Sequence, residues 1–177
     1  MSARRVGAAI LLLVGPKGIG KTTLGRALGE LPGATFLDVE AVARRELAAR
    51  GGVLDQVYVD GVLDATVAEA RAQLVTTRRL ALETTGAFDG AARYLARLRA
   101  LAPVILIRVR AGLETCARRI AARDASRQVA IPDDMIRAMH RRCEALTWPW
   151  DLVIDNDPPQ APAAVVARVS AYLEGRA

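Results

Sequence analysis

One nine-residue segment constrains the fold of this chain more than any other feature. It reads Gly15-Pro16-Lys17-Gly18-Ile19-Gly20-Lys21-Thr22-Thr23 and matches the pattern G-x-x-x-x-G-K-[ST] in full. The apolar run Ala8 to Val14 precedes it, and a predicted helix begins near Lys21. Glycines let the backbone N–H groups of such a turn converge on phosphate oxygens, and the helix start adds partial positive charge. The segment therefore predicts a strand, a phosphate-binding loop and a helix, in that order.

Two residues of this loop have predicted chemical roles. Lys21 would reach the β- and γ-phosphates of ATP, and the Thr22 hydroxyl would ligate the Mg²⁺ that bridges them. The chain has 25 Lys and Arg residues, yet Lys17 and Lys21 are its only lysines. Lys21 stands where a compact ammonium on a flexible stem is wanted. Lys17 is either a further phosphate ligand or a solvated loop residue. ATP and Mg²⁺ are the expected cofactors.

The rest of the chain predicts one α/β domain. At 177 residues a single domain over 1–177 is expected. Short apolar runs alternate with longer stretches of helical spacing, which is typical of parallel strands joined by crossover helices. The predicted strands are Ala8 to Val14, Ala34 to Leu37, Arg79 to Glu83, Val104 to Val109 and Leu152 to Ile154. The predicted fold is a doubly wound parallel sheet with helices on both faces, whose ligands bind beyond the carboxyl ends of the strands.

Composition restricts the partners of the chain. The net charge is +6 and the pI about 10.1, which suits phosphate-rich ligands, but the arginines are scattered. Aromatic residues make up 4%, too few for a platform that stacks nucleic-acid bases, so nucleic acid is possible but not favoured. Cys116, Cys143 and His140 are too few for a disulfide framework or a zinc site, and reduced thiols favour the cytoplasm. No run approaches the ~20 apolar residues that span a bilayer, and no membrane partner is expected.

Acidic residues follow two of the predicted strands. Asp38 follows Ala34 to Leu37, at the same edge of the sheet as the loop, and is the predicted base that accepts the proton of an acceptor hydroxyl. Its alternative role is the N-cap of the next helix. Glu40 would bind the acceptor or a magnesium-bound water, or else complement the helix dipole. Glu83 is predicted to support Mg²⁺ from the end of the third strand.

These features together resemble the small P-loop kinases, a group that includes shikimate kinase, gluconate kinase and polynucleotide-kinase-like proteins. Phe36-Leu37-Asp38-Val39-Glu40 is similar to the F-x-D-x-D stretch of shikimate kinase, whose acids serve magnesium and the acceptor hydroxyl. From Val104 onward the chain is more similar to the polynucleotide-kinase-like members. The resemblance implies a three-layer P-loop NTPase fold, a five-stranded parallel sheet of order 2-3-1-4-5 and a short lid at about 123–132. It also implies that the loop Asn156 to Pro159 contacts adenine.

Arginines near this lid are the predicted cations of the transfer step. Arg123 and Arg127 flank the lid, and their guanidinium groups suit phosphate oxygens. The alternative interpretation of each is a solvated arginine on the face of a helix. Arg119 and Arg142 are secondary candidates.

The departures from these families leave the acceptor open. Shikimate kinase has three glycines where this chain has Thr84-Thr85-Gly86, and no arginine lies between Gly51 and Ala70 to hold a carboxylate. Polynucleotide kinases have an arginine three residues after the catalytic Asp, a place that Ala41 takes here; the nearest candidate is Arg44. The first hypothesis is an ATP-dependent kinase of a small hydroxyl-bearing metabolite. The alternatives are a nucleotide or polynucleotide 5′-hydroxyl kinase and a non-catalytic nucleotide-binding regulator. The oligomeric state is left open.

Overall fold

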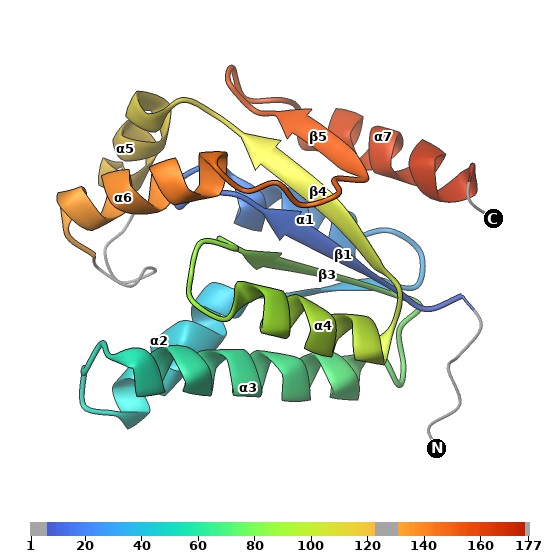
Figure 1. The fold of residues 1–177 in the computed structure, drawn as a ribbon. Helices are drawn as coiled ribbons and strands as arrows, with labels where there is room; N and C mark the ends of the chain where they lie inside the picture. The colour runs from blue at the N-terminus through green and yellow to red at the C-terminus, as the bar shows by residue number, and fades with distance from the viewer. Residues whose placement is uncertain (1–6, 123–130, 176–177) are drawn as a thin grey trace.

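The strands form one parallel sheet in the computed structural model, which describes residues 7–122 and 131–175 (Figure 1). Its spatial order is β2-β3-β1-β4-β5, the order that the resemblance implied. In the central register Leu12 lies beside Leu82 on one side and Leu106 on the other. The strands are β1 (Ala9–Val14), β2 (Ala34–Leu37), β3 (Arg79–Thr84), β4 (Val104–Arg110) and β5 (Leu152–Asp155). The predicted fold class is confirmed, and each predicted strand is present to within a residue at either end.

Helices cover both faces of the sheet and give the three layers (Figure 1). Over the described part of the chain they are α1 (Lys21–Gly29), α2 (Val39–Ala49), α3 (Gln56–Gln73), α4 (Ala91–Leu101), α5 (Leu113–Ala121), α6 (Asp133–Glu144) and α7 (Pro162–Glu174). Helices α2, α3 and α4 pack against one face, and α1, α5 and α7 against the other. Each connection between neighbouring parallel strands thus includes at least one helix, as parallel pairing requires.

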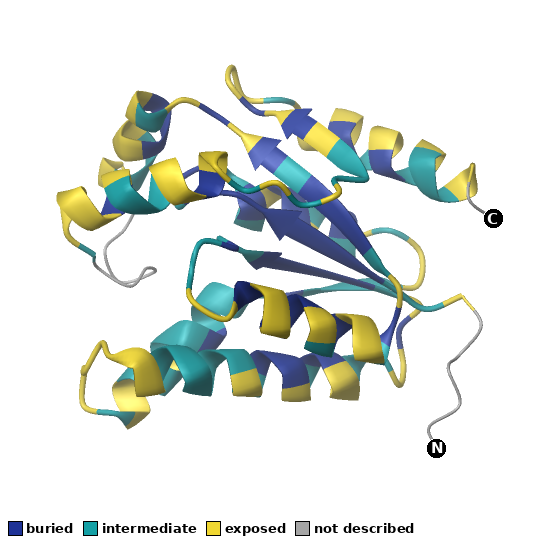
Figure 2. Cartoon of the chain, viewed as in Figure 1, coloured by how far each residue is buried: buried dark blue, intermediate teal, exposed yellow. Residues whose placement is uncertain are grey.

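The central strand explains why the first apolar run is continuous. Side chains of a strand point alternately to opposite faces. Ile10, Leu12 and Val14 therefore pack under α3 and α4, while Leu11 and Leu13 pack under α1 and α7. All five are essentially inaccessible to solvent, and Figure 2 shows the inner strands as the buried centre of the molecule. A strand covered on both faces can carry apolar side chains at every position.

Two negative findings hold for the residues that the structure describes. No helix there is long and apolar enough to cross a membrane. Cys116 and Cys143 are both buried and form no disulfide, and burial raises the pKa of the Cys143 thiol to about 11. The greater part of the predicted lid, residues 123–130, lies outside the described residues.

Candidate active site

The phosphate-binding loop connects the end of β1 to the start of α1. The Gly15 N–H donates to the Thr84 carbonyl at 3.2 Å, which ties the loop to β3. Gly18 and Gly20 have φ of +85° and +101°, a region that glycine adopts without steric cost. A Cβ on Gly18 would lie 2.5 Å from the Cys116 carbonyl oxygen, so the backbone needs glycine here for space as well. The loop is thus closely fitted against β3 and α5.

Lys21 lies inside this loop, at the first residue of α1. Its side chain is buried at 7% exposure, and its ammonium donates to the carbonyls of Gly15 at 2.8 Å and Pro16 at 2.9 Å. Its charge also acts on the nearby Glu83 carboxyl, and a cation buried at a glycine-rich loop of this kind suits a phosphate ligand. Gly15, Pro16, Gly18 and Ile19 are buried with it, whereas Thr23 faces solvent.

Thr22 and Glu83 form the second part of the site. The Thr22 hydroxyl is 3.0 Å and 3.1 Å from the two carboxylate oxygens of Glu83, 61 residues away in sequence. Burial raises the pKa of the Glu83 carboxyl, and Asp38 and Glu40 raise it further, while Lys21 and the Thr22 hydrogen bond lower it. These electrostatic couplings show that the predicted loop residues and the predicted acids lie within one site.

The donor set of this pair fits Mg²⁺. A hydroxyl and a carboxylate are the hard oxygen ligands that Mg²⁺ takes, usually with nucleotide phosphates and waters as its other ligands. Within the described ranges, no group of three or more His, Cys, Asp or Glu side chains is arranged to hold a metal without a nucleotide. Thr22 and Glu83 would therefore hold the ion together with bound ATP.

Asp38 takes the alternative role considered from the sequence, and its role as the base stays a prediction. It is the N-cap of α2, where its Oδ1 accepts the N–H of Ala41 at 3.0 Å. Its Oδ2 accepts a hydrogen bond from the Arg26 guanidinium at 3.0 Å. The cap and the cation fix the carboxylate at the carboxyl edge of the sheet, and each oxygen keeps a lone pair for a further donor. Arg26 has no motif around it, and only the packing of α1 beside β2 brings it to Asp38.

Glu40 connects α2 to the phosphate-binding loop. Its Oε1 is 3.1 Å from the Lys17 ammonium, and the Lys17 side chain is only 12% exposed. Lys17 therefore does not extend into solvent. Arg44 lies half-buried one turn further along α2. Tyr58, on α3, was not foreseen: burial raises its pKa, and the charges of Glu40 and Glu46 raise it further.

Two further side chains, Asn156 and Arg119, hold the phosphate-binding loop in place. The Asn156 side chain is 5% exposed, and its Nδ2 donates to the Ile19 carbonyl at 2.7 Å. The Arg119 guanidinium donates to the same carbonyl at 3.2 Å and to the Asn156 carbonyl at 2.9 Å. Arg119 and Asn156 thus tie the loop to α5 and to the end of β5. Contact of the loop at 156–159 with adenine stays a prediction.

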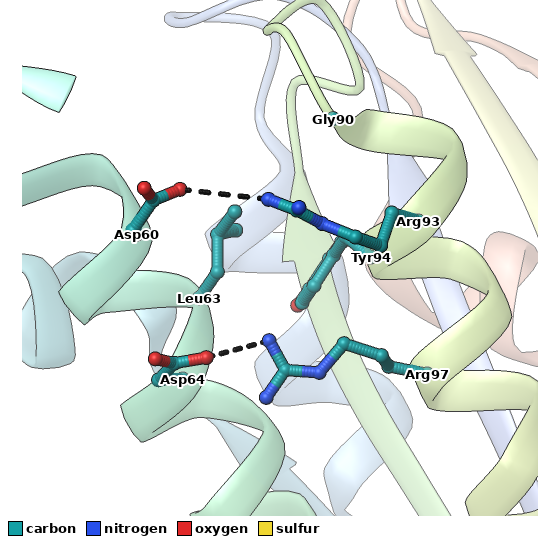
Figure 3. A pocket seen from close by; sticks show the side chains of 7 residues that line it. All are labelled: Asp60, Leu63, Asp64, Gly90, Arg93, Tyr94 and Arg97. Carbon is teal, nitrogen blue, oxygen red and sulfur yellow. Dashed lines mark hydrogen bonds and ion pairs between the residues drawn. The ribbon is translucent and has the colours of Figure 1, made fainter. Parts of the chain in front are cut away.

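The acids of α3 do not belong to this site. Figure 3 shows the Asp64 and Asp60 carboxylates facing Arg97 and Arg93 of α4, at 2.6 Å and 3.9 Å. These side chains line a groove of about 320 Å³ between α3 and α4. Two other acids lie between Gly51 and Ala70. Asp55 pairs with Arg50, which follows α2, and Glu69 pairs with Arg45 within α2. The segment is therefore held by arginines that lie outside it.

The structure describes two of the four arginines considered near the lid, Arg119 and Arg142. Arg123 and Arg127 lie outside the described residues, and their predicted roles stay predictions. Arg142 pairs with Asp89 at 2.8 Å, and both side chains are exposed. Of the two that the structure describes, Arg119 contacts the phosphate-binding loop through the Ile19 carbonyl, and Arg142 pairs with Asp89.

Several solved structures that share this fold are kinases. A sugar kinase from Janibacter sp. matches with a TM-score of 0.65 and 21% identity, over 94% of this chain and 95% of that one. A gluconokinase from Sinorhizobium meliloti gives 0.64 and 18%, over 98% and 95%. A shikimate kinase from Acinetobacter baumannii, solved in complex with shikimate, gives 0.61 and 21%, over 96% and 94%. At such identities the likeness shows the fold, over nearly the whole of both chains.

Curated proteins match over shorter segments. The ATP-dependent protease ATPase subunit HslU of a Bradyrhizobium strain is 37% identical over 91 residues, which is 46% of this chain. HslU of Cereibacter sphaeroides is 39% identical over 64 residues, which is 36% of this chain. The chain spans only 21% and 14% of the length of these relatives.

A family model covers the site as a whole. The model described as an AAA domain matches residues 10–146, which includes the phosphate-binding loop, Asp38, Glu40 and Glu83. The match extends over well more than half of the chain. This protein therefore belongs to that AAA domain family, with the fold of the small P-loop kinases.

Proposed function

We propose that the protein is an ATP-dependent kinase that transfers the γ-phosphoryl group to a hydroxyl of a small metabolite. The observation that carries this proposal is that Asp38 and Glu40 stand at the same edge of the sheet as Lys21, Thr22 and Glu83. Donor and acceptor groups would then meet in one place, which is the main requirement of phosphoryl transfer. The fold shared with a sugar kinase, a gluconokinase and a shikimate kinase supports it.

The chain's own groups would divide the chemistry between them. The backbone of residues 15–20 and Lys21 would bind the β- and γ-phosphates. Thr22 and Glu83 would hold Mg²⁺, which when bound offsets negative charge on the phosphates. Asp38 would orient the acceptor hydroxyl and take its proton, as the acceptor oxygen bonds to the γ-phosphorus and the bond to the β,γ-bridging oxygen breaks. ADP and a phosphate ester are the products.

The test combines an acceptor panel with two variants. Purified protein is incubated with labelled ATP, Mg²⁺ and sugars, sugar acids, cyclic acids, nucleosides and 5′-hydroxyl oligonucleotides. We expect transfer to at least one small hydroxyl compound. Lys21→Ala removes the buried ammonium and should lower nucleotide affinity by about a hundredfold or more. Asp38→Asn should leave nucleotide affinity within about threefold and lower the rate by about a hundredfold or more.

The same panel separates the alternatives. Transfer to oligonucleotides alone would replace this proposal with a polynucleotide 5′-hydroxyl kinase, and the binding would weaken steeply with salt. Tight nucleotide binding with no transfer to any acceptor would favour a non-catalytic regulator. Full turnover in the Asp38→Asn variant would exclude that carboxylate as the base.

A further inference from the structure

The loop motif does not explain why a lysine stands at position 17. The motif leaves this position open. The Lys17 side chain is nonetheless directed inward, at 12% exposure, and its ammonium lies 3.1 Å from Glu40. In a chain whose other basic residues are arginines, both lysines stand in this loop. Lysine has a compact charge on a flexible stem, whereas the arginine fork demands a planar partner.

The sheet order determines what this ion pair spans. Lys17 follows β1 and Glu40 follows β2, but β3 lies between those two strands. The Lys17–Glu40 pair therefore crosses the carboxyl end of β3, where Glu83 and Thr22 meet. The phosphate ligands lie on the β1 side of this crossing, and Asp38 lies on the β2 side. A phosphoryl group that moves between them passes beside the Lys17 ammonium.

The contribution of the Lys17–Glu40 ion pair to folding stability does not by itself explain why the pair is present. Ion pairs with partly exposed partners contribute about 0–1 kcal/mol, and ordering a lysine side chain costs entropy. The Glu40 side chain is 32% exposed, so the pair is not deeply buried. The local charges point elsewhere: Asp38, Glu40 and Glu83 bring three acids to the edge where the nucleotide would bring more negative charge. A cation between the two groups of anions lowers their repulsion.

The geometry points to Lys17 as a second ligand of the nucleotide's terminal phosphate, one that keeps hold of Glu40 and so joins a bound triphosphate to the start of α2. This inference rests on the proposed function. Lys17 is then a determinant of triphosphate over diphosphate recognition, and Glu40 is a positioning residue. Lys21, by contrast, would bind the phosphates of ATP and of ADP alike.

Calorimetric titration with Mg²⁺-ADP and with the Mg²⁺ complex of a nonhydrolysable ATP analogue tests this assignment. Lys17→Met should weaken binding of the analogue by about tenfold, the value of one charge-assisted hydrogen bond, and binding of ADP by about twofold at most. Lys17→Arg should recover part of the loss, because it keeps the charge. Arg97→Met, which breaks an ion pair of α4 away from the loop, is the matched control and should change neither affinity.

Glu40→Gln supplies an independent measurement that does not depend on the folding of the Lys17 variants. Removing the carboxylate frees the ammonium for phosphate, so the preference for the analogue over ADP should rise by about threefold or more. That rise should vanish in the Lys17→Met/Glu40→Gln double variant, as a double-mutant cycle would detect.

The outcomes separate the two levels of the proposal. Equal weakening of both nucleotides by Lys17→Met, or no weakening, overturns the role of Lys17 and leaves the kinase proposal standing. An unchanged preference in Glu40→Gln likewise overturns it. Failure of the wild-type protein to bind either nucleotide overturns both.

Discussion

The two sides of the candidate site are built in different ways. On the phosphate side, residues 15–20 are fixed by backbone hydrogen bonds and by buried donors, with Asn156 and Arg119 both bound to one loop carbonyl. On the proposed acceptor side, α2, α3 and α4 pack on the sheet through apolar side chains, and ion pairs of exposed or half-exposed arginines link these helices to one another. The difference indicates that the phosphate-binding loop is held more closely than the outer faces of these helices. Substitutions of one kind should therefore have unequal effects on the two sides.

Glycine replacement should show the largest difference. Gly20 and Gly52 both have positive φ, at +101° and +86°. A Cβ on Gly20 would lie 2.6 Å from Asn156 Nδ2, whereas one on Gly52 would meet no atom within 4 Å. Asn156 cannot yield easily, because its amide holds both Ile19 and Gln160. Gly52→Ala should lower the free energy of unfolding by about 1–2 kcal/mol, and Gly20→Ala by about 2–4 kcal/mol.

Urea unfolding of both variants measures these values. Gly20→Ala should also weaken nucleotide binding, while Gly52→Ala should leave it unchanged. Similar losses of stability in the two variants would contradict the view that the phosphate side is the more closely packed one.

Glu83 should give the phosphate side a pH dependence of its own. Burial raises the pKa of this carboxyl, so the native state keeps the proton at pH values where the unfolded chain, with a pKa of about 4.3, has lost it. Stability contributed by Glu83 therefore falls as pH rises from the unfolded value to the native one. Glu83→Gln removes this loss and should therefore gain stability, relative to wild type, as the pH rises through that window.

Unfolding curves at a series of pH values, without nucleotide, test this expectation. A constant difference between Glu83→Gln and wild type at every pH would refute the raised pKa of Glu83. Unchanged Mg²⁺-ATP binding in that variant would refute the proposed role of Glu83 in holding Mg²⁺.

The acceptor side should give the smallest effect. Arg97→Met breaks the pair with Asp64, in which the side chains are 39% and 69% exposed. Because solvent screens such pairs, the variant should lose about 0.2–1 kcal/mol of unfolding free energy, and less in high salt. A double-mutant cycle with Asp64→Asn isolates the pair. A coupling above about 2 kcal/mol would show that α3 and α4 are held as firmly as the phosphate-binding loop.

The same contrast explains what could be predicted from the sequence. The phosphate side follows local rules: a continuous apolar run for a doubly covered strand, glycines for positive φ, and one lysine at a fixed spacing. Those rules act over a few residues, so the loop and all five strands could be located without coordinates. The roles of Glu83 and Asp38 could be proposed because both directly follow strands that end at one edge.

The rest depends on contacts between residues distant in sequence. The pairing of Arg26 with Asp38, and of Asn156 with the Ile19 carbonyl 137 residues away, leaves no periodic trace. Among so many arginines, no pattern distinguishes the one that holds the loop from those that pair with acids on the surface. The pairing of the α3 acids with arginines on α2 and α4 is likewise invisible in the sequence.

The position of β3 has one further consequence, which concerns distance. Neighbouring strands lie about 4.8 Å apart, so the two strands on either side of β3 are separated by roughly 10 Å. The Lys17–Glu40 pair bridges that gap between the residues that follow β1 and those that follow β2. Were β1 and β2 adjacent, the first turn of α2 would lie directly against the glycine-rich turn. The intervening strand thus works as a spacer between the two.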